Sequence, residues 1–284
     1  MQQYITKNIS ITDLPEMTKQ LHQPIKILHG KGDLSLLNAG KRVGIVGARK
    51  FTPYGREVTD QLSTALARAG VTIVSGLALG VDSIAHKACV DAGGKTIAVL
   101  PSGIDKIYPS SHKNLADQIV QKGGLLISEY PADHIPMRHD FIERNRIIAG
   151  LSDILIVTEA ALSSGSLHTA SFALELGVTV MAVPGNITSQ YSAGTNQLIQ
   201  NGAFPILNAQ NVLEHLGISG PKKIEYIPEN EIEQKILYIL GEKQTTTQYL
   251  AEESGLRPDQ LAVQLTLLEI KDVILAENGY WKIK

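Results

Sequence analysis

Cationic, aromatic and amide side chains are concentrated in one short segment, RHDFIERNRIIAG, at residues 138–150. Within nine residues it holds Arg138, Phe141, Arg144, Asn145 and Arg146. Arginines neutralise phosphates and an accessible ring offers a face for a base, so this combination suits single-stranded nucleic acid. The alternative is that the ring packs in the core and the last two arginines pair with Glu143 or Glu159.

A second candidate for anion chemistry is the segment KRVGIVGARKFTPYG at residues 41–55. The apolar run 42–46 is typical of a buried parallel strand, and it ends at Gly47-Ala48-Arg49 before a helical pattern. A strand, a glycine turn and a helix start can present backbone N–H groups to a phosphate. Arg49 adds a positive charge at that turn. The alternative is a simple tight turn with a solvated arginine.

Small turns that contain glycine recur after the expected strands. They are Gly47-Ala48-Arg49, Ser75-Gly76, Ser102-Gly103, Ser163-Ser164-Gly165-Ser166 and Pro184-Gly185-Asn186. In a parallel sheet these turns lie together at the carboxyl ends of the strands, where ligands bind. The repetition predicts an edge that binds several phosphates or other oxyanions.

These turns need a sheet to position them, and the chain carries the corresponding periodicity. Strand-like runs begin near Val43, Val71, Thr96, Leu125, Ile154, Thr179 and Phe204, about 25 to 29 residues apart, the length of one strand-helix unit. Each helical stretch closes on glycine, where a left-handed cap is expected. The pattern predicts an α/β protein with a doubly wound, Rossmann-like, mostly parallel sheet.

The domain organisation follows from breaks in this pattern. Residues 1–40 contain only short helical hints and a turn at residues 31–33, so we expect a lead-in that packs on the main domain. Residues 41–216 form the Rossmann-like domain, and residues 217–224 have the composition of a linker. Residues 225–284 predict three helices and a hairpin with an Asn-Gly turn, which together indicate a winged helix-turn-helix domain.

Composition narrows the class of protein. The chain has 284 residues, 43% hydrophobic and 19% charged, with a net charge of −2. This describes an ordinary globular protein without a general basic coat, so any polyanion site must be local. No run is long enough to span a membrane and no signal peptide is evident, so we expect a cytoplasmic protein. The single cysteine, Cys89, is expected to pack in the core or at its boundary rather than to act as a nucleophile.

Enzyme hypotheses find less support. No G-x-G-x-x-G follows the first strand, so a dinucleotide cofactor is not expected. Asp82 and His86 lie at i, i+4 without a third ligand, which favours a structural pair over a metal site. Glu129 and Glu159 each follow a strand and are the only carboxylates placed for hydrolysis. They keep a nucleoside monophosphate hydrolase as the alternative function.

The C-terminal domain has a weak nucleic-acid signal. Residues 217–284 hold eight basic and eleven acidic side chains, a poor match for phosphates. The apolar positions of the helix that would read DNA look like core. We therefore expect a protein-contact or auxiliary role for this domain.

Several motifs together resemble the DNA-processing protein A (DprA/Smf) family over residues ~30 to ~215. In order they are IVGARKFTPYG, VSGLALGVDSIAH, IAVLPSGIDKIYP, ISEYP, FIERNRIIAGLSDILIV, SGSLHTA and AVPG followed by GTNQLI. The resemblance implies a homodimer that binds single-stranded DNA without catalysis. It also implies protection of incoming strands in natural transformation and loading of the RecA recombinase.

The resemblance also implies site residues, matched motif by motif. The phosphate-contacting arginine of the family's first turn corresponds to Arg49, with Gly47 in the same turn. The family's basic residue and aromatic correspond to Arg138 and Phe141. The RNR segment corresponds to Arg144, Asn145 and Arg146, and the pocket-lining loops to Ser102-Gly103 and Ser164-Gly165-Ser166.

The chain departs from the family pattern at several positions. Ala48 replaces a serine or threonine, Ile142 replaces a proline, and Leu79 stands where an arginine is common. Losing that arginine weakens the expected polyanion contact, and Lys113 and His168 are candidates to replace its charge.

Overall fold

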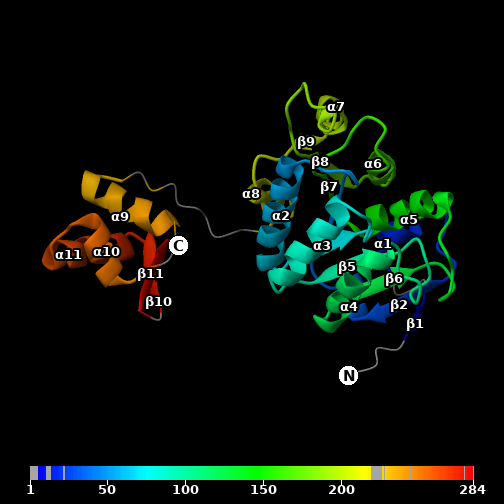
Figure 1. Cartoon of the computed structure of the whole chain (residues 1–284), viewed down its shortest axis with the longest axis horizontal. Helices are drawn as coiled ribbons and strands as arrows, with labels where there is room; N and C mark the ends of the chain where they lie inside the picture. The colour runs from blue at the N-terminus through cyan, green and yellow to red at the C-terminus, as the bar shows by residue number, and fades with distance from the viewer. Residues whose placement is uncertain are drawn as a thin grey trace. The chain divides into compact units, whose positions relative to one another are not determined.

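The computed structural model describes residues 6–10, 14–21, 23–218, 226, 228–242, 245–277 and 279–283, without the side chains of residues 17, 241 and 242. The chain divides into two compact units, Met1–Ile218 and Ser219–Lys284 (Figure 1). Residues 219–224 of the predicted linker lie outside the described residues. Each unit is described by itself.

The first unit is built on a large, mostly parallel sheet. Its parallel strands are β3 (Arg42–Val46), β4 (Thr72–Ser75), β5 (Thr96–Val99), β6 (Leu125–Ser128), β7 (Ile154–Val157), β8 (Thr179–Ala182) and β9 (Phe204–Pro205). They lie in the order β6-β5-β4-β3-β7-β8-β9. All seven predicted strands are therefore confirmed. Continuous apolar runs form them because both faces of the sheet are covered.

The N-terminal segment corrects one expectation. Two strands, β1 (Lys7–Ile9) and β2 (Leu28–Gly32), extend the sheet by antiparallel pairing beyond β6. The turn predicted at residues 31–33 is thus partly strand, and Asp33 begins the 3-10 helix η2 (Leu34–Leu37). The helical hint at residues 11–21 appears as the short α1 (Glu16–Lys19), with residues 11–13 outside the described part.

Helices cover both faces of this sheet (Figure 1). One face packs against α2 (Pro53–Arg68), α3 (Val81–Asp91), α4 (Lys113–Gln121) and α8 (Ala209–His215). The other packs against α5 (Arg138–Leu151), α6 (Ser166–Glu175), α7 (Ala193–Gln200) and the segment around α1. A short 3-10 helix, η3 (Ser110–His112), precedes α4. The predicted glycine caps have positive φ at Gly70, Gly93, Gly123, Gly177 and Gly202.

The strand order fixes where a ligand can bind. Strand β3 lies between β4 and β7, and the chain winds outward in opposite directions on either side of it. The connections after β3 and β7 therefore separate at their carboxyl ends and leave a crevice. The candidate turns of the sequence lie at this edge.

The second unit has its own hydrophobic core. It consists of α9 (Glu231–Glu242), α10 (Thr247–Ser254), α11 (Pro258–Ile270) and a hairpin of β10 (Ile274–Glu277) and β11 (Tyr280–Ile283). Asn278 of the predicted hairpin turn lies outside the described residues. In the described parts of both units, no helix combines the length and hydropathy that crossing a lipid bilayer requires.

Candidate nucleic-acid interface

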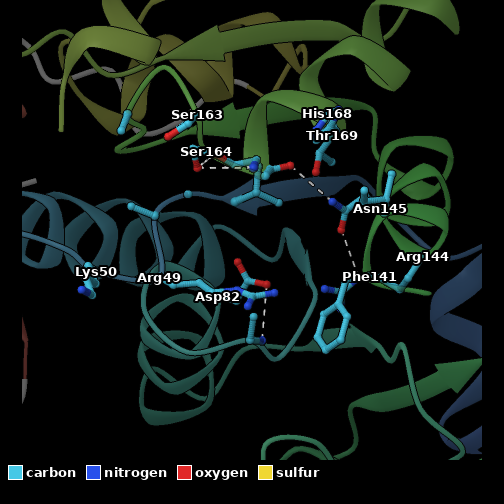
Figure 2. A pocket seen from close by; sticks show the side chains of 18 of the residues that line it. Arg49, Lys50, Asp82, Phe141, Arg144, Asn145, Ser163, Ser164, His168 and Thr169 are labelled. Atoms are coloured by element: carbon cyan, nitrogen blue, oxygen red, sulfur yellow. Dashed lines mark hydrogen bonds between the residues drawn. The ribbon is translucent and has the colours of Figure 1, made fainter. Parts of the chain in front are cut away.

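A cavity of about 850 Å³ opens at the carboxyl ends of β3 and β7. Its walls come from the turn after β3, the N-terminal half of α5 and the loop that leads into α6 (Figure 2). Nine of the predicted site residues line it together: Gly47, Arg49, Arg138, Phe141, Arg144, Asn145, Ser164, Gly165 and Ser166. Residues far apart in the sequence therefore share one site.

The turn after β3 departs from the predicted mode of anion binding. The Ala48 N–H donates to the Glu159 carbonyl oxygen (2.7 Å), so it is not free for a phosphate. The Glu159 carboxylate also accepts hydrogen bonds from the Thr52 N–H (2.8 Å) and hydroxyl (2.6 Å) at the start of α2. The chain's own carboxylate thus occupies the positive end of α2 that we expected a ligand to use.

The same contacts hold the turn rigidly against the sheet. A Cβ on Gly47 would lie 2.7 Å from the Val81 Cγ2 and 2.9 Å from the Glu159 carbonyl oxygen. Glycine is therefore required here for close packing. The side chain of Arg49 projects from this fixed turn and is exposed.

Phe141 contributes the accessible aromatic ring. The ring is half-buried on the first turn of α5, and the Arg49 guanidinium carbon lies 5.0 Å from its centroid. The Tyr108 ring meets it edge to face, with centroids 5.6 Å apart and planes at 75°. Arg49, Phe141 and the exposed Arg138 thus line the same cavity.

Arg144 also lines the cavity, but its side chain is buried. The guanidinium donates to the carbonyl oxygens of Gly76 and Val99, and its Nε donates to the Asn145 Oδ1 (3.1 Å). Burial lowers the pKa of Arg144 to about 10, with Arg49 adding to the shift and Asp82 opposing it. Arg144 remains cationic at neutral pH and fixes α5 against the loop after β4 and the end of β5.

The opposite wall is polar and comes from the loop before α6. The Ser164 and Ser166 hydroxyls lie 2.8 Å apart, and the Asn145 Nδ2 donates to the Gly165 carbonyl oxygen at 3.5 Å (Figure 2). The Asn145 amide is therefore oriented by partners on both of its atoms.

The charge of the cavity is positive on balance. Four cations line it, Arg49, Lys50, Arg138 and Arg144, against one carboxylate, Asp82. Asp82 is buried and accepts hydrogen bonds from the N–H groups of Gly76 (3.1 Å) and Ala78 (3.4 Å). Burial raises its pKa, and Arg144 and these N–H groups oppose the shift. Among the described residues that line the cavity, the exposed charged side chains are therefore all cationic.

Four predicted site residues do not line this cavity. Ser102 and Gly103 are buried after β5, and Lys113 is exposed at the start of α4. Arg146 is buried on the other side of α5, where it pairs with Glu129 (Nη2 to Oε1, 2.8 Å) and borders a separate cavity of about 550 Å³. In this structure Arg146 supports α5 rather than the main cavity.

The cavity also includes residues that were not among the predicted contacts. They are Lys50, Asp82, Tyr108, Ile142, Thr169 and Tyr191, with small residues between them. Ser163 of the predicted serine turn and His168, a candidate to replace the missing charge, also line the cavity. Tyr108 lies in the segment IAVLPSGIDKIYP, but nothing in the sequence indicates that its ring meets Phe141.

The start of α5 is held by a buried carboxylate. Asp140 accepts hydrogen bonds from the Met137 N–H (2.7 Å) and the His134 ring (Nε2, 2.7 Å), and His139 Nε2 lies 3.1 Å from its other oxygen. Burial opposes ionisation, but the hydrogen bonds from His134, the Met137 N–H and Tyr130 outweigh it and hold the pKa of Asp140 below its usual value. This network sets the position of Arg138 and Phe141.

The residues considered for catalysis have structural partners. Asp82 and His86 have separate hydrogen-bond partners among the described residues: Asp82 accepts from the N–H groups of Gly76 and Ala78, and His86 Nδ1 lies 2.7 Å from the Thr96 hydroxyl. Burial lowers the pKa of His86 to about 3, so its ring stays neutral. Glu129 and Glu159 are engaged by Arg146 and Thr52 and are not among the residues that line the main cavity.

The chain is similar in sequence and in structure to known proteins. Residues 7–217 match the family described as DNA recombination-mediator protein A. The DNA processing protein DprA of Bacillus subtilis is 43% identical over 208 residues, which cover 73% of this chain and 70% of the relative.

Two solved structures share the fold of the first unit. DNA processing protein A from Streptococcus pneumoniae has a TM-score of 0.68 at 38% identity, covering 75% of this chain and 74% of that one. DNA processing protein A from Helicobacter pylori, whose structure concerns a single-stranded DNA binding mode, has a TM-score of 0.68 at 35% identity, covering 75% and 96%.

Proposed function

This chain belongs to the DNA recombination-mediator protein A family, and from that premise we propose that it binds single-stranded DNA in the Arg49 cavity. Arg49, Lys50 and Arg138 neutralise phosphates at the rim, and Phe141 stacks on a base. The observation that carries the proposal is the half-buried Phe141 ring beside the Arg49 guanidinium, inside a cavity whose exposed charges are cationic.

The volume of the cavity and the chemistry of its walls favour a flexible single strand over a folded ligand. The cavity holds about 850 Å³, room for only a few nucleotide units, and its polar wall of serines and Asn145 offers donors to sugars and base edges. The proposed contacts are Gly47, Arg49, Arg138, Phe141, Asn145, Ser164, Gly165 and Ser166, with Arg144 acting as a buried charge beneath them. Ser102, Gly103, Lys113 and Arg146 take part only as supports or as contacts outside the cavity.

We propose binding without turnover. A nucleotide hydrolase needs a carboxylate that reaches the ligand, and the two candidates, Glu129 and Glu159, already serve Arg146 and the start of α2. Formation of a product from any member of a nucleoside monophosphate panel, lost on Glu159→Gln, would favour the hydrolase instead.

The test is a binding series with single- and double-stranded oligonucleotides across salt concentrations. Three exposed cations predict that log affinity for the single strand falls by about 2 per log unit of salt. Arg49→Ala should weaken binding several-fold and reduce that slope by about 0.7, because one phosphate contact is lost.

The matched control is Arg68→Ala, an exposed arginine at the far end of α2. It should leave both affinity and slope unchanged. An equal effect of both substitutions, or no effect of Arg49→Ala, would refute the role of the cavity.

The wider role is proposed from the family. We infer that the protein is a cytoplasmic homodimer that protects incoming strands in natural transformation and loads the RecA recombinase on them. We also infer that Ser219–Lys284 is a winged-helix domain, supported by its three helices and terminal hairpin. Acceleration of RecA filament formation on strands coated with single-strand-binding protein tests the loading role.

A further inference from the structure

Tyr108 is an aromatic side chain at the cavity that the proposed binding mode leaves unused. It lies between β5 and η3, lines the cavity and is 48% exposed, although tyrosine rings usually bury most of their surface. In the described part of the chain, no hydrogen-bond partner of its hydroxyl is found. Its one described ring contact is with Phe141.

The geometry of the two rings sets what they can bind together. Their centroids lie 5.6 Å apart, but their planes differ by 75°. Two consecutive bases that stack on each other have nearly parallel planes, so they cannot cover both rings. Bases on Phe141 and Tyr108 must instead be separated from one another, with the backbone turning between them.

Arg49 is placed to hold that turn. Its guanidinium carbon lies 5.0 Å from the centroid of Phe141, so a phosphate bound to Arg49 belongs to the nucleotide whose base covers this ring or to its neighbour. A bend brings phosphates closer together, and the net positive rim offsets their repulsion.

Resting on the proposed function, we infer that Tyr108 is a second base-stacking residue and that the strand turns at the corner between Tyr108 and Phe141. The ligand is therefore a single strand with at least two unstacked bases. A duplex keeps its bases stacked and paired, so it cannot reach both rings. The pair of rings thus selects single strands over duplexes.

The experiment compares ten-unit oligothymidylate with an abasic strand that carries the same phosphates. Tyr108→Ala should weaken binding of oligothymidylate about fivefold or more, the lower end of what one stacked base contributes. Binding of the abasic strand should change less than twofold, and the salt slope should stay constant. Tyr108→Phe should retain wild-type affinity for both strands.

Two further variants separate stacking from support of Phe141. In the Phe141→Ala background, Tyr108→Ala should lower oligothymidylate affinity by a similar factor again, because the two rings act on different bases. No further loss would show that Tyr108 acts only by positioning Phe141. Tyr238→Ala, at an exposed tyrosine of the second unit, should change neither affinity.

The outcomes distinguish this inference from the function on which it rests. If wild-type protein binds oligothymidylate and Arg49→Ala weakens it, the function stands. Equal losses on oligothymidylate and on the abasic strand, or no loss with Tyr108→Ala, then overturn the second stacking residue alone. Failure of wild-type protein to bind either strand overturns both.

Discussion

Arg144 and Arg146 have different roles, because they lie on different sides of α5. Residues two apart on a helix point in nearly opposite directions. Arg144 therefore faces the main cavity and Arg146 faces Glu129. The sequence alone grouped them as one basic cluster, and the helical spacing was the signal that could have separated them.

Other features of the site could not be predicted from local sequence. The Ala48 N–H is used by the Glu159 carbonyl oxygen, a partner more than a hundred residues away. Likewise, the meeting of Tyr108 with Phe141 depends on how two connections cross the sheet edge. The spacing of the turns could indicate which residues share an edge, but not which donors were already occupied.

The Arg146–Glu129 pair leads to a stability prediction. Arg146→Met should lower the free energy of unfolding by about 3 kcal/mol, because Glu129 is left charged and largely buried. Burial already raises the pKa of Glu129, and Arg146 opposes that shift. Without Arg146 the pKa of Glu129 rises further. The loss of stability in Arg146→Met should therefore become smaller as the pH falls and Glu129 takes up a proton.

Urea unfolding at neutral pH and near pH 5 measures this effect. The control is Arg138→Ala, which should reduce DNA affinity and leave stability within about 0.5 kcal/mol. Arg146→Met protein that remains folded should bind DNA with an unchanged salt slope. A flatter slope would show that Arg146 contacts a phosphate of the DNA.

At the scale of elements, the regular strand-helix units were predictable and the edge strands were not. β3 and β7 are apolar runs with β-branched residues, and such runs favour a buried strand wherever they occur. β2, with the sequence LHGKG, has two glycines and no β-branched residue. β2 forms a strand because it pairs with the otherwise open edge of β6. A contact with a distant segment, and not its local sequence, therefore determines its structure.

Helix α5 carries Arg138 and Phe141, two of the proposed DNA contacts, and Asp140 fixes the start of this helix. Asp140→Asn should lower stability at neutral pH by about 2 kcal/mol, the contribution of hydrogen bonds to a charged group. It should also weaken DNA binding, because Arg138 and Phe141 lie in the adjoining turn.

The pH dependence of that loss has a definite sign. The pKa of Asp140 is lower in the folded protein than in the unfolded chain, where it is about 3.9. Its contribution is therefore present above about pH 4 and is lost as the pH falls through the folded value. Urea unfolding should show the two proteins converging in acid, and Asp133→Asn, at an exposed aspartate, should match the wild type throughout. An equal difference in the free energy of unfolding between wild type and Asp140→Asn at every pH would contradict this account.

At the scale of the whole molecule, the proposed homodimer needs an apolar contact surface. Large apolar side chains are exposed along the β9 edge of the sheet, with Phe204 49% and Leu207 78% exposed. Ile187, 91% exposed, follows the neighbouring strand β8. Exposed large apolar side chains, such as Phe204 and Leu207 at this sheet edge, are typical of a protein interface.

Leu207→Glu should therefore convert dimers to monomers, because a charge would be buried in the contact. Light scattering coupled to gel filtration measures the mass across protein concentrations. Leu174→Glu, which changes an exposed leucine on α6, is the control and should leave the mass unchanged. A wild-type protein of monomer mass at every concentration would contradict the dimer.

The central position of β3 has a consequence for the newly made chain. Val43 of β3 pairs with Ile154 of β7. One edge of β3 therefore stays unpaired until β7 has been synthesised. Until then an apolar strand has an open edge, the kind of surface on which growing chains aggregate. Efficient refolding should accordingly demand dilute protein, since the pairing that closes the sheet joins distant segments and forms slowly.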